Sequence, residues 1–383
     1  MPELYSKENL VQCCGCTACF AECPTGAITM VRDEEGFLYP SVDKEKCIEC
    51  SACVHVCPLK GNGKSAGEKE TKTFVALKNK NKETILSSSS GGAFSAISDY
   101  VLEQGGVVYG VAFDEKLQAV HMRAVDKAGR DEMRISKYLQ SEMRDVFKQV
   151  KADVDYGVEV IFTGTPCQVA GLKRFLKKDY ENLYTVDIIC HGVPSPLMFA
   201  EHIKNIEKTR KKKVENYKCR SKVQGWHRHI EEAVFETGKK EAGTPLLQEH
   251  KVLFYGGNIL RPSCYECQFT NLYRPSDITL GDFWGIEKCM PEWDDQTGTS
   301  MVLVNSHKGE QLLEKIGEKI VVRKSEVYGR QPQLELPVKK PAGREEFWAL
   351  YRKYGYRYIA AKYGSNNFKG RVKYVVKKVL RKS

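Results

Sequence analysis

The chain has 383 residues, of which 42% are hydrophobic and 28% charged, and its formal net charge is +11. This composition is typical of a soluble globular protein, and the length predicts two or three domains. Because the sequence has no long apolar segment and no basic-then-apolar N-terminal signal, we expect a cytoplasmic protein. Fifteen cysteines in such a reducing compartment argue against a disulfide framework and favour metal binding or redox chemistry.

The first 60 residues contain a cysteine motif, C-x2-C-x2-C-x3-C-P, that occurs twice. Its cysteines are Cys13, Cys16, Cys19 and Cys23 in the first copy and Cys47, Cys50, Cys53 and Cys57 in the second. This spacing is the ligand pattern of bacterial ferredoxins with two 4Fe-4S clusters. We therefore predict an α+β ferredoxin-like module over residues 1–60. Zinc is the competing interpretation, but zinc sites usually pair two short cysteine knuckles across a longer spacer.

The fourth cysteine of each copy is expected to ligate the cluster of the other copy. One cluster would then be held by Cys13, Cys16, Cys19 and Cys57, and the other by Cys47, Cys50, Cys53 and Cys23. Cys14 falls out of register with the motif. We interpret Cys14 as a packing thiol.

A polar, Gly- and Lys-rich stretch over residues 61–72 predicts a linker. From residue 73 to 335, short apolar runs alternate with helical stretches, which is typical of a mixed α/β domain. Its first unit is a strand at Thr73–Leu77, a Ser/Gly loop at Ser87–Gly92 and a helix with Phe94, Ile97, Val101 and Leu102 on its apolar face. The N-terminus of that helix offers backbone N–H groups to a phosphate, although a serine-rich loop can also simply be flexible. The segments GGVVYGVAF and AVHMRAV that follow predict a pair of strands.

Two later units each place a cysteine in the turn between a buried strand and an amphipathic helix. These cysteines are Cys167 in VEVIFTGTPCQVAGLKRFL and Cys190 in LYTVDIICHGVPSPLMFAEHI. Turns of this kind line the ligand crevice of an open α/β sheet. Cys264 and Cys267 follow as an isolated C-x2-C, which is compatible with zinc, a cluster or a structural role.

The segments SSSSGGAFSAI, SKYLQS, FTGTPCQVAGLK, DIICHGVPSP, CYECQF and SDITLGDFWG follow one another in this order. Together they resemble the beta-subunit family of coenzyme F420 hydrogenases and dehydrogenases, in the form with an N-terminal two-cluster ferredoxin domain. The resemblance implies an iron-sulfur flavoprotein that binds FAD and passes electrons between clusters and a two-electron partner, F420 or another small molecule. Some relatives lie near genes for surface polysaccharide synthesis, so such a substrate is also implied.

The resemblance also implies site residues. The flavin-side positions are Ser90, Gly91, Gly92, Lys137, Gln140 and Ser141. The ligands of a third 4Fe-4S cluster are Cys167, Cys190, Cys264 and Cys267.

The implied partners are a redox protein or reduced ferredoxin and a small-molecule substrate. The alternative function is a non-catalytic electron-transfer subunit that feeds a partner enzyme, and an interaction protein with decayed cofactor sites fits less well because all eight ferredoxin cysteines are in register.

Single polar residues near these motifs are weaker candidates. His191 follows Cys190 and is our candidate for proton transfer beside a flavin, although it can instead hydrogen-bond the turn. Asp282 is either a cofactor hydrogen-bonder or a turn residue. We expect His227 and His229 to lie on a strand at the surface.

The positive charge is concentrated at the C-terminus, where residues 339–383 contain 14 Lys and Arg against 2 Glu. We predict a basic amphipathic helical tail over residues 336–383, with Val372, Val375, Val376, Val379 and Leu380 on its apolar face. Such a tail can lie on an anionic membrane, here the inner membrane face, dock an acidic partner or pack on its own domain. Nucleic acid is not expected as a partner because no binding module accompanies the charge.

Overall fold

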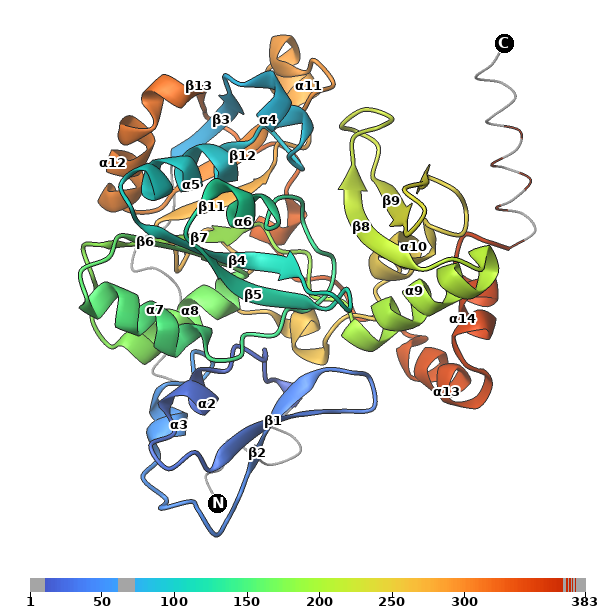
Figure 1. The fold of residues 1–383 in the computed structure, drawn as a ribbon, viewed down its shortest axis with the longest axis horizontal. Helices are drawn as coiled ribbons and strands as arrows, with labels where there is room; N and C mark the ends of the chain where they lie inside the picture. Colours follow the sequence, from blue (N-terminus) through green and yellow to red (C-terminus); the bar gives the residue numbers. More distant parts are fainter. Residues whose placement is uncertain are drawn as a thin grey trace.

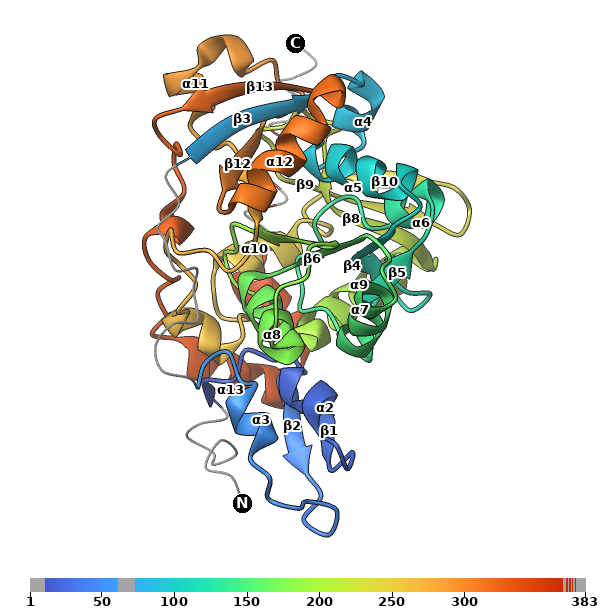
Figure 2. The ribbon, with the colours of Figure 1, turned by 90° about the vertical axis from the view of Figure 1, so that its left-hand side faces the viewer.

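The computed structural model describes residues 11–60 and 73–367, together with residues 370, 372, 374 and 376. The predicted linker over residues 61–72 lies outside these ranges. In the described part, a small N-terminal module lies at one end of a larger mixed α/β body (Figures 1 and 2). Among the described residues, no helix is both long and apolar enough to span a membrane.

The N-terminal module consists of two short helices and an antiparallel hairpin. In chain order its elements are α2 (Ala18–Glu22), β1 (Ile28–Arg32), β2 (Leu38–Val42) and α3 (Ala52–His55). The helices are short because each cysteine motif must turn tightly, and both are preceded by a residue in the left-handed conformation, Thr17 and Ser51. The module therefore keeps most of its cysteines on loops and at helix ends.

The body is built on an eight-stranded mixed sheet. Its strands, in spatial order, are β13 (Ile320–Ser325), β3 (Thr73–Asn79), β12 (Ser300–Val304), β11 (Ile278–Asp282), β7 (Leu183–Ile188), β6 (Val160–Gly164), β4 (Val107–Phe113) and β5 (Ala119–Ala124). The four strands β11, β7, β6 and β4 are mutually parallel, and β12 is antiparallel to both β11 and β3. Hence β3 runs in the same direction as the parallel strands, and five carboxyl ends meet at one edge of the sheet.

Helices cover both faces of this sheet (Figure 2). They are α4 (Lys82–Leu86), α5 (Ala93–Glu103), α6 (Lys127–Asp131), α7 (Val146–Asp155), α8 (Pro166–Leu176), α11 (Ile286–Cys289) and α12 (His307–Lys315). Each face of the sheet packs against helices to form a hydrophobic core, and successive side chains of β4 point to opposite faces. Val107 and Tyr109 pack with α7 and α8, whereas Val108 packs with α5 and α12. The predicted strand pair formed by β4 and β5 and the predicted apolar face of α5 are thus confirmed.

A second lobe flanks the sheet and contains a three-stranded antiparallel sheet (Figure 1). Its elements are β8 (Val214–Ser221), β9 (Ile230–Phe235), β10 (Lys240–Ala242), α9 (Pro196–Arg210), α10 (Glu249–Tyr255), a short 3-10 helix η2 (Pro262–Glu266), α13 (Arg344–Tyr354) and α14 (Tyr356–Tyr363). Trp226 and His227 lie in the loop between β8 and β9, so the predicted strand at His227 and His229 is wrong.

The C-terminal helices correct the prediction of a basic tail that begins at residue 336. Phe347, Trp348 and Ile359 are completely or almost completely buried and pack with Leu253 and Ile259 of the second lobe. Aromatic burial on this scale outweighs the solvation of the neighbouring lysines, so α13 and α14 belong to the body. Further on, Val372 and Val376 are about half exposed, whereas Val375, Val379 and Leu380 lie outside the described residues.

The N-terminal module shares a hydrophobic core with the body. Cys16, Ala18 and Val56 of the module belong to the same buried cluster as Phe147 of α7 and Leu172 of α8. Gly171 allows the close approach, because a Cβ atom there would lie 2.9 Å from Cys16 Sγ. The loop that carries the first cysteine motif is therefore packed directly against the helix that follows β6.

Candidate iron-sulfur and flavin site

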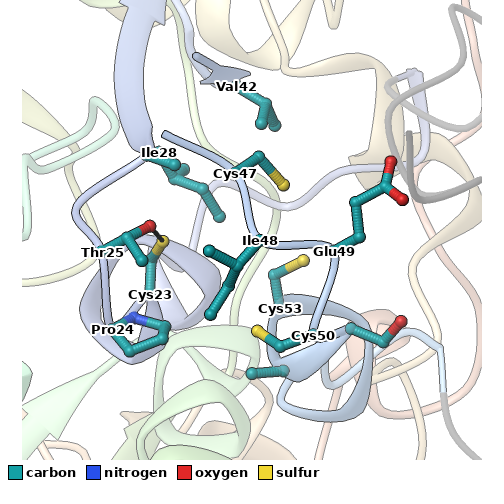
Figure 3. A pocket seen from close by; sticks show the side chains of 13 residues that line it. Cys23, Pro24, Thr25, Ile28, Val42, Cys47, Ile48, Glu49, Cys50 and Cys53 are labelled. Carbon is teal, nitrogen blue, oxygen red and sulfur yellow. Dashed lines mark hydrogen bonds between the residues drawn. The ribbon is translucent and has the colours of Figure 1, made fainter. Parts of the chain in front are cut away.

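One group of cysteines lines a pocket at the end of the module that faces away from the body. Cys23, Cys47, Cys50 and Cys53, which we call the outer group, line this pocket (Figure 3). Figure 3 shows Cys23 on one side of Ile48 and the other three cysteines on the opposite side. The grouping of Cys23 with the second motif is the crossed arrangement expected from the sequence.

The environment of Cys23 favours the thiolate form that an iron ligand needs. Burial opposes ionisation, but hydrogen bonds from the Thr25 hydroxyl and from the backbone N–H groups of Thr25, Ala27 and Ile28 lower the pKa of Cys23. The Thr25 oxygen lies 3.7 Å from the Cys23 sulfur. Hydrogen bonds of this kind stabilise negative charge on sulfur and tune the potential of a bound cluster.

A second group of cysteines lies between the outer group and the body. Cys13, Cys16, Cys19 and Cys57 form this inner group. A hydrogen bond with Cys14 favours the Cys16 thiolate, but burial and the charges of Cys19 and Cys57 raise the pKa of Cys16 above its usual value. Burial and the charge of Cys13 likewise raise the pKa of Cys57. These mutual effects place Cys57 with the first motif, again in the crossed arrangement.

A third group forms at the carboxyl edge of the main sheet and is called the sheet-edge group. Its members are Cys167 in the first turn of α8, Cys190 after β7, Cys264 within η2 and Cys267 directly after it. Burial raises the pKa of Cys190 well above its usual value, and the charges of Cys264, Cys167 and Cys267 add to this effect. Burial also raises the pKa of Cys267 to about 11. Four thiols from distant segments therefore adjoin one another.

Backbone pairing brings these distant segments together. Pro194 and Leu260 form an isolated antiparallel bridge, and Arg261 N donates to Val193 O at 3.0 Å. Val193 N lies 3.5 Å from the Cys264 sulfur. The turn after β7 is thus hydrogen-bonded to the segment that carries the C-x2-C motif. Spacing in the sequence does not reveal this contact.

Cys14 links the inner group to the sheet-edge group. Hydrogen bonding with Cys14 is the main cause that raises the pKa of the Cys167 thiol well above its usual range, and burial adds to it. Hydrogen bonding with Cys16 of the inner group is likewise the main cause that raises the pKa of Cys14 well above its usual value. This thiol therefore lies at the contact between the module and the body, a position that the packing interpretation of Cys14 did not anticipate.

The donor sets fit iron-sulfur clusters. Each group supplies four thiols, which is the ligand set of a 4Fe-4S cluster. Within residues 11–60 and 73–367, no three His, Cys, Asp or Glu side chains are gathered closely enough to hold a single metal ion. Ligation by the twelve cysteines stays a prediction.

The predicted flavin-side residues do not form one site. The Ser90 hydroxyl donates to Thr299 O at 2.8 Å, and Gly91 N donates to Ser300 Oγ at 3.0 Å. A Cβ atom on Gly91 would lie 2.3 Å from Leu77 O, so this glycine serves close packing against β3. Part of the Ser/Gly loop therefore forms hydrogen bonds at the start of β12, and these groups are not free to bind a phosphate.

The other three predicted residues lie along one segment that leads away from the Ser/Gly loop. Lys137 Nζ donates to Glu132 O at 2.6 Å and to Arg134 O at 2.8 Å, and burial lowers its pKa to about 7. Gln140 Nε2 donates to Cys14 O at 3.0 Å, and Ser141 Oγ bonds to His121 Nδ1 at 3.0 Å. Gln140 and Ser141 thus lie where the module meets the body, away from Ser90.

Two arginines near the carboxyl edge were not identified from the sequence. One lies at the Ser/Gly loop and the other contacts an aromatic side chain. Arg134 donates to Ser87 Oγ at 3.1 Å, and Arg220 donates to Asp282 at 3.0 Å while stacking on Trp284. The Nε atoms of both arginines are buried and have no hydrogen-bond partner in the described part of the chain. Orphaned buried donors are uncommon and suggest a missing acceptor.

The structure also places His191 and Asp282 at the carboxyl edge. His191 contacts the rings of Phe254 and Tyr255, and its Nδ1 atom lies 3.0 Å from Gln333 Nε2. Burial lowers the pKa of His191, and its Nε2 atom is buried without a partner in the described residues. Asp282 accepts from Trp226 Nε1 at 2.8 Å as well as from Arg220.

His229 lies close to the same aromatic side chains. Its ring lies 4.8 Å from the Tyr138 ring, and Nδ1 bonds to the Tyr255 hydroxyl at 2.9 Å. Burial lowers the pKa of His229 to about 2. His229 is therefore partly buried among these rings rather than fully at the surface.

Two parts of the chain match known protein families. Residues 12–60 match the family described as 4Fe-4S dicluster domain, and residues 157–328 match the family described as the C terminus of the coenzyme F420 hydrogenase/dehydrogenase beta subunit. Over 50 residues the chain is 48% identical to the B subunit of the ion-translocating oxidoreductase complex of Methanosarcina acetivorans. That match spans 13% of this chain and only 17% of the relative's length.

A solved structure of the F420-reducing NiFe hydrogenase complex of Methanosarcina barkeri, derivatised with xenon, contains a similar chain. The similarity covers 80% of this chain and 97% of that chain, with 16% identity and a TM-score of 0.46. The two family matches together account for the cysteine groups of the module and for the segments that carry the sheet-edge group. The chain therefore combines a 4Fe-4S dicluster domain over residues 12–60 with a domain over residues 157–328 that matches the C terminus of the coenzyme F420 hydrogenase/dehydrogenase beta subunit.

Proposed function

We propose that the chain is an iron-sulfur flavoprotein oxidoreductase that exchanges electrons between its cysteine-bound clusters and a two-electron organic substrate. The observation that carries the proposal is the series of three cysteine groups, which starts at the far end of the module and ends at the carboxyl edge of the sheet. A protein that only carried electrons would not need the third group or a body of this size. Iron-sulfur clusters supply transfer of one electron at a time.

The three cysteine groups differ in solvent exposure, and an exposed cysteine lies at the outer end of the series. Cys50 of the outer group is exposed, and the neighbouring Ile48 side chain is 64% exposed. Cys16 of the inner group is buried against α8, and the four sheet-edge cysteines are half-buried. A redox partner protein is therefore expected to contact the outer group, while the substrate is served from the body.

The carboxyl edge of the sheet supports a flavin position in the body. Ligands bind at this edge in open α/β sheets. The unpartnered Nε atoms of Arg134 and Arg220 and the Nε2 atom of His191 supply three buried nitrogen donors on that side of the molecule. Phosphate oxygens and ring carbonyls are acceptors that would satisfy them. When bound, a flavin supplies the conversion between one-electron and two-electron chemistry.

His191 has the features of a group that holds a proton near the substrate. With the Gln333 amide donating to Nδ1, the ring proton of the neutral imidazole lies on Nε2. The depressed pKa keeps the ring neutral near pH 7. Nε2 is then positioned to donate a hydrogen bond to the bound cofactor or substrate, and Phe254 and Tyr255 exclude water from one side of the ring.

An anaerobic inventory of iron, acid-labile sulfide and flavin tests the proposal. About twelve irons and one flavin per chain are expected, because three groups of four thiols each match one 4Fe-4S cluster. Cys190→Ser is expected to lose about four irons, whereas Cys289→Ser, which changes an exposed cysteine on α11, is expected to lose none. About eight irons and no flavin in the unaltered protein would overturn the proposal.

Coenzyme F420 is the first substrate to test, because the family that residues 157–328 match is described by this coenzyme. A precursor of surface polysaccharide is the second class of substrate to test. Anaerobic oxidation of reduced F420 is followed by its absorbance, with a viologen dye as the one-electron acceptor. Turnover by the chain alone is expected of an oxidoreductase. Turnover that requires an added partner protein would make the chain an electron-transfer subunit instead.

A further inference from the structure

Arg261 lies at the point where the inner group and the sheet-edge group come together. Its side chain is completely buried, and its guanidinium donates three hydrogen bonds to three separate segments. These bonds go to Cys13 O at 2.6 Å, Gln140 Oε1 at 2.7 Å and Leu38 O at 3.0 Å. The first acceptor is the carbonyl of a predicted cluster ligand.

The main chain of Arg261 is bonded to the sheet-edge group. Arg261 N donates to Val193 O at 3.0 Å in the segment after Cys190, and Cys264 N donates to Arg261 O at 2.9 Å. One residue therefore fixes the backbone of both cysteine groups. A shift of either group relative to the other would break bonds at Arg261.

The surroundings of the guanidinium hold it in one orientation. Its centre lies 4.1 Å from the Tyr39 ring and 5.4 Å from the Phe37 ring of the module hairpin. A Cβ atom on Gly15 would lie 2.8 Å from Arg261 Nη1 and 2.5 Å from Gln140 Nε2, and Gly15 has a φ of +70°. The loop between Cys13 and Cys16 thus needs glycine to let this cation approach.

In the part of the chain that the structure describes, Arg261 forms no ion pair with a carboxylate and lies among cysteines. Its hydrogen-bond acceptors are two carbonyls and an amide, so it has no carboxylate partner among them. Burial acts to lower the pKa of Arg261, and the groups whose ionised forms would oppose this effect are Cys13, Tyr39, Cys14 and Cys264. A buried cation without a carboxylate is costly unless anionic groups nearby balance it.

We propose that Arg261 is a positioning residue that joins the inner and sheet-edge groups, and that its buried positive charge raises the reduction potential of the clusters that these groups hold. The part that concerns the sheet-edge group rests on the proposed function. Reduction adds one electron to a cluster and its thiolates without breaking a bond, so the reduced state is more negative by one charge. A fixed cation nearby stabilises that state.

The test is a redox titration of the full chain with dithionite under anaerobic conditions, followed by electron paramagnetic resonance. In Arg261→Gln, which keeps a hydrogen-bond donor but loses the charge, the ratio of reduced to oxidised inner cluster at a fixed potential is expected to fall roughly tenfold. Arg261→Lys keeps the charge and is expected to stay within about threefold of the unaltered protein. The outer cluster is expected to remain unchanged in both variants.

Two controls separate charge from packing. Gln140→Leu removes an uncharged partner of Arg261, and Arg344→Met removes another cation that contacts the module, at its hairpin tip. Neither variant is expected to move the potential of the inner cluster. Loss of the inner cluster in Arg261→Gln alone, with normal loading in Arg261→Lys and Gln140→Leu, would also support a requirement for the charge.

Equal potentials and equal loading in Arg261→Gln and the unaltered protein would overturn the proposal, as would an equal shift in Gln140→Leu. The inner cluster belongs to the dicluster domain and does not depend on a third cluster or a flavin. A protein that lacks both would still show the inner-cluster shift, so failure of the proposed function and failure of this proposal can be distinguished.

Discussion

Arg344 at the start of α13 is paired with Glu35 at the tip of the module hairpin. Its Nη1 atom lies 2.8 Å from Glu35 Oε1, and its Nη2 atom bonds the second carboxylate oxygen. The same guanidinium donates to the Tyr265 hydroxyl at 3.0 Å and to Leu260 O at 3.1 Å. A C-terminal helix therefore holds the N-terminal module through a two-pronged ion pair that is largely shielded from solvent.

Arg344→Met is expected to lower the free energy of unfolding by about 3 kcal/mol, because it leaves the Glu35 carboxylate without its partner in a partly buried site. Anaerobic denaturant unfolding measures this change. The matched control is Arg352→Met on the same helix, where the pair with Glu34 is 3.6 Å long and both side chains are at least half exposed. That control is expected to cost less than about 0.5 kcal/mol. Equal losses in the two variants would show that the pair with Glu35 has no special role.

Gly171→Ala tests the contact between the module and α8. A Cβ atom at this position would lie 2.9 Å from Cys16 Sγ and 3.0 Å from Cys16 Cβ, so the first cysteine loop has to move. The expected result is a loss of about 1–3 kcal/mol in the free energy of unfolding and an altered resonance spectrum of the inner cluster. Gly317→Ala is the control, because a Cβ atom added there would meet no atom within 4 Å. An unchanged spectrum in Gly171→Ala would contradict the tight packing of this loop.

The sequence was sufficient for features that depend on local spacing. The two cysteine motifs gave the module, and the strand-turn-helix units gave the turns at Cys167 and Cys190. Periodicity of apolar residues also predicted the face of α5 and the pair formed by β4 and β5. In each case the signal lies within about 20 consecutive residues, so no knowledge of tertiary contacts was needed.

Contacts between distant segments could not be predicted in this way. Cys14 is out of register with the motif, and only the docking of the module places it beside Cys167. Gln140 and Ser141 adjoin the Ser/Gly loop in the family resemblance, yet the chain carries them to the module interface. The burial of the aromatic residues of α13 was not predicted, because the density of charged residues in a sequence does not show which face of a helix is buried.

Cys57→Ser tests the crossed ligand sets. The variant is expected to lose or alter the inner cluster, because the Cys57 thiol lies with Cys13 and Cys16 rather than with Cys47. Resonance spectra and iron content are compared with those of Cys13→Ser and Cys47→Ser. The Cys57→Ser spectrum should match that of Cys13→Ser. A match with Cys47→Ser would instead assign Cys57 to the outer group and refute the crossed arrangement.

His202 makes stability depend on pH. It is fully buried on α9, with Nδ1 3.0 Å from the Tyr356 hydroxyl of α14 and Nε2 3.0 Å from the Tyr217 hydroxyl of β8. Burial lowers its pKa to about 3, although the nearby charge of Glu231 partly opposes this shift. The pKa of an unfolded histidine is about 6.5, so the unfolded chain binds one more proton between these two values. The stability due to neutral His202 is complete above about pH 6.5 and is lost as the pH falls toward 3.

The free energy of unfolding of the unaltered protein is therefore expected to fall more steeply than that of His202→Gln, by about 1.4 kcal/mol for each pH unit between pH 6 and 4. Denaturant unfolding at matched cluster content measures the two slopes, so that acid loss of iron affects both proteins alike. His307→Gln is the control, since the His307 side chain is 80% exposed, and its slope should equal that of the unaltered protein. Parallel curves for His202→Gln and the unaltered protein would mean that His202 takes up its proton equally in both states, which its buried contacts with Tyr356 and Tyr217 do not allow.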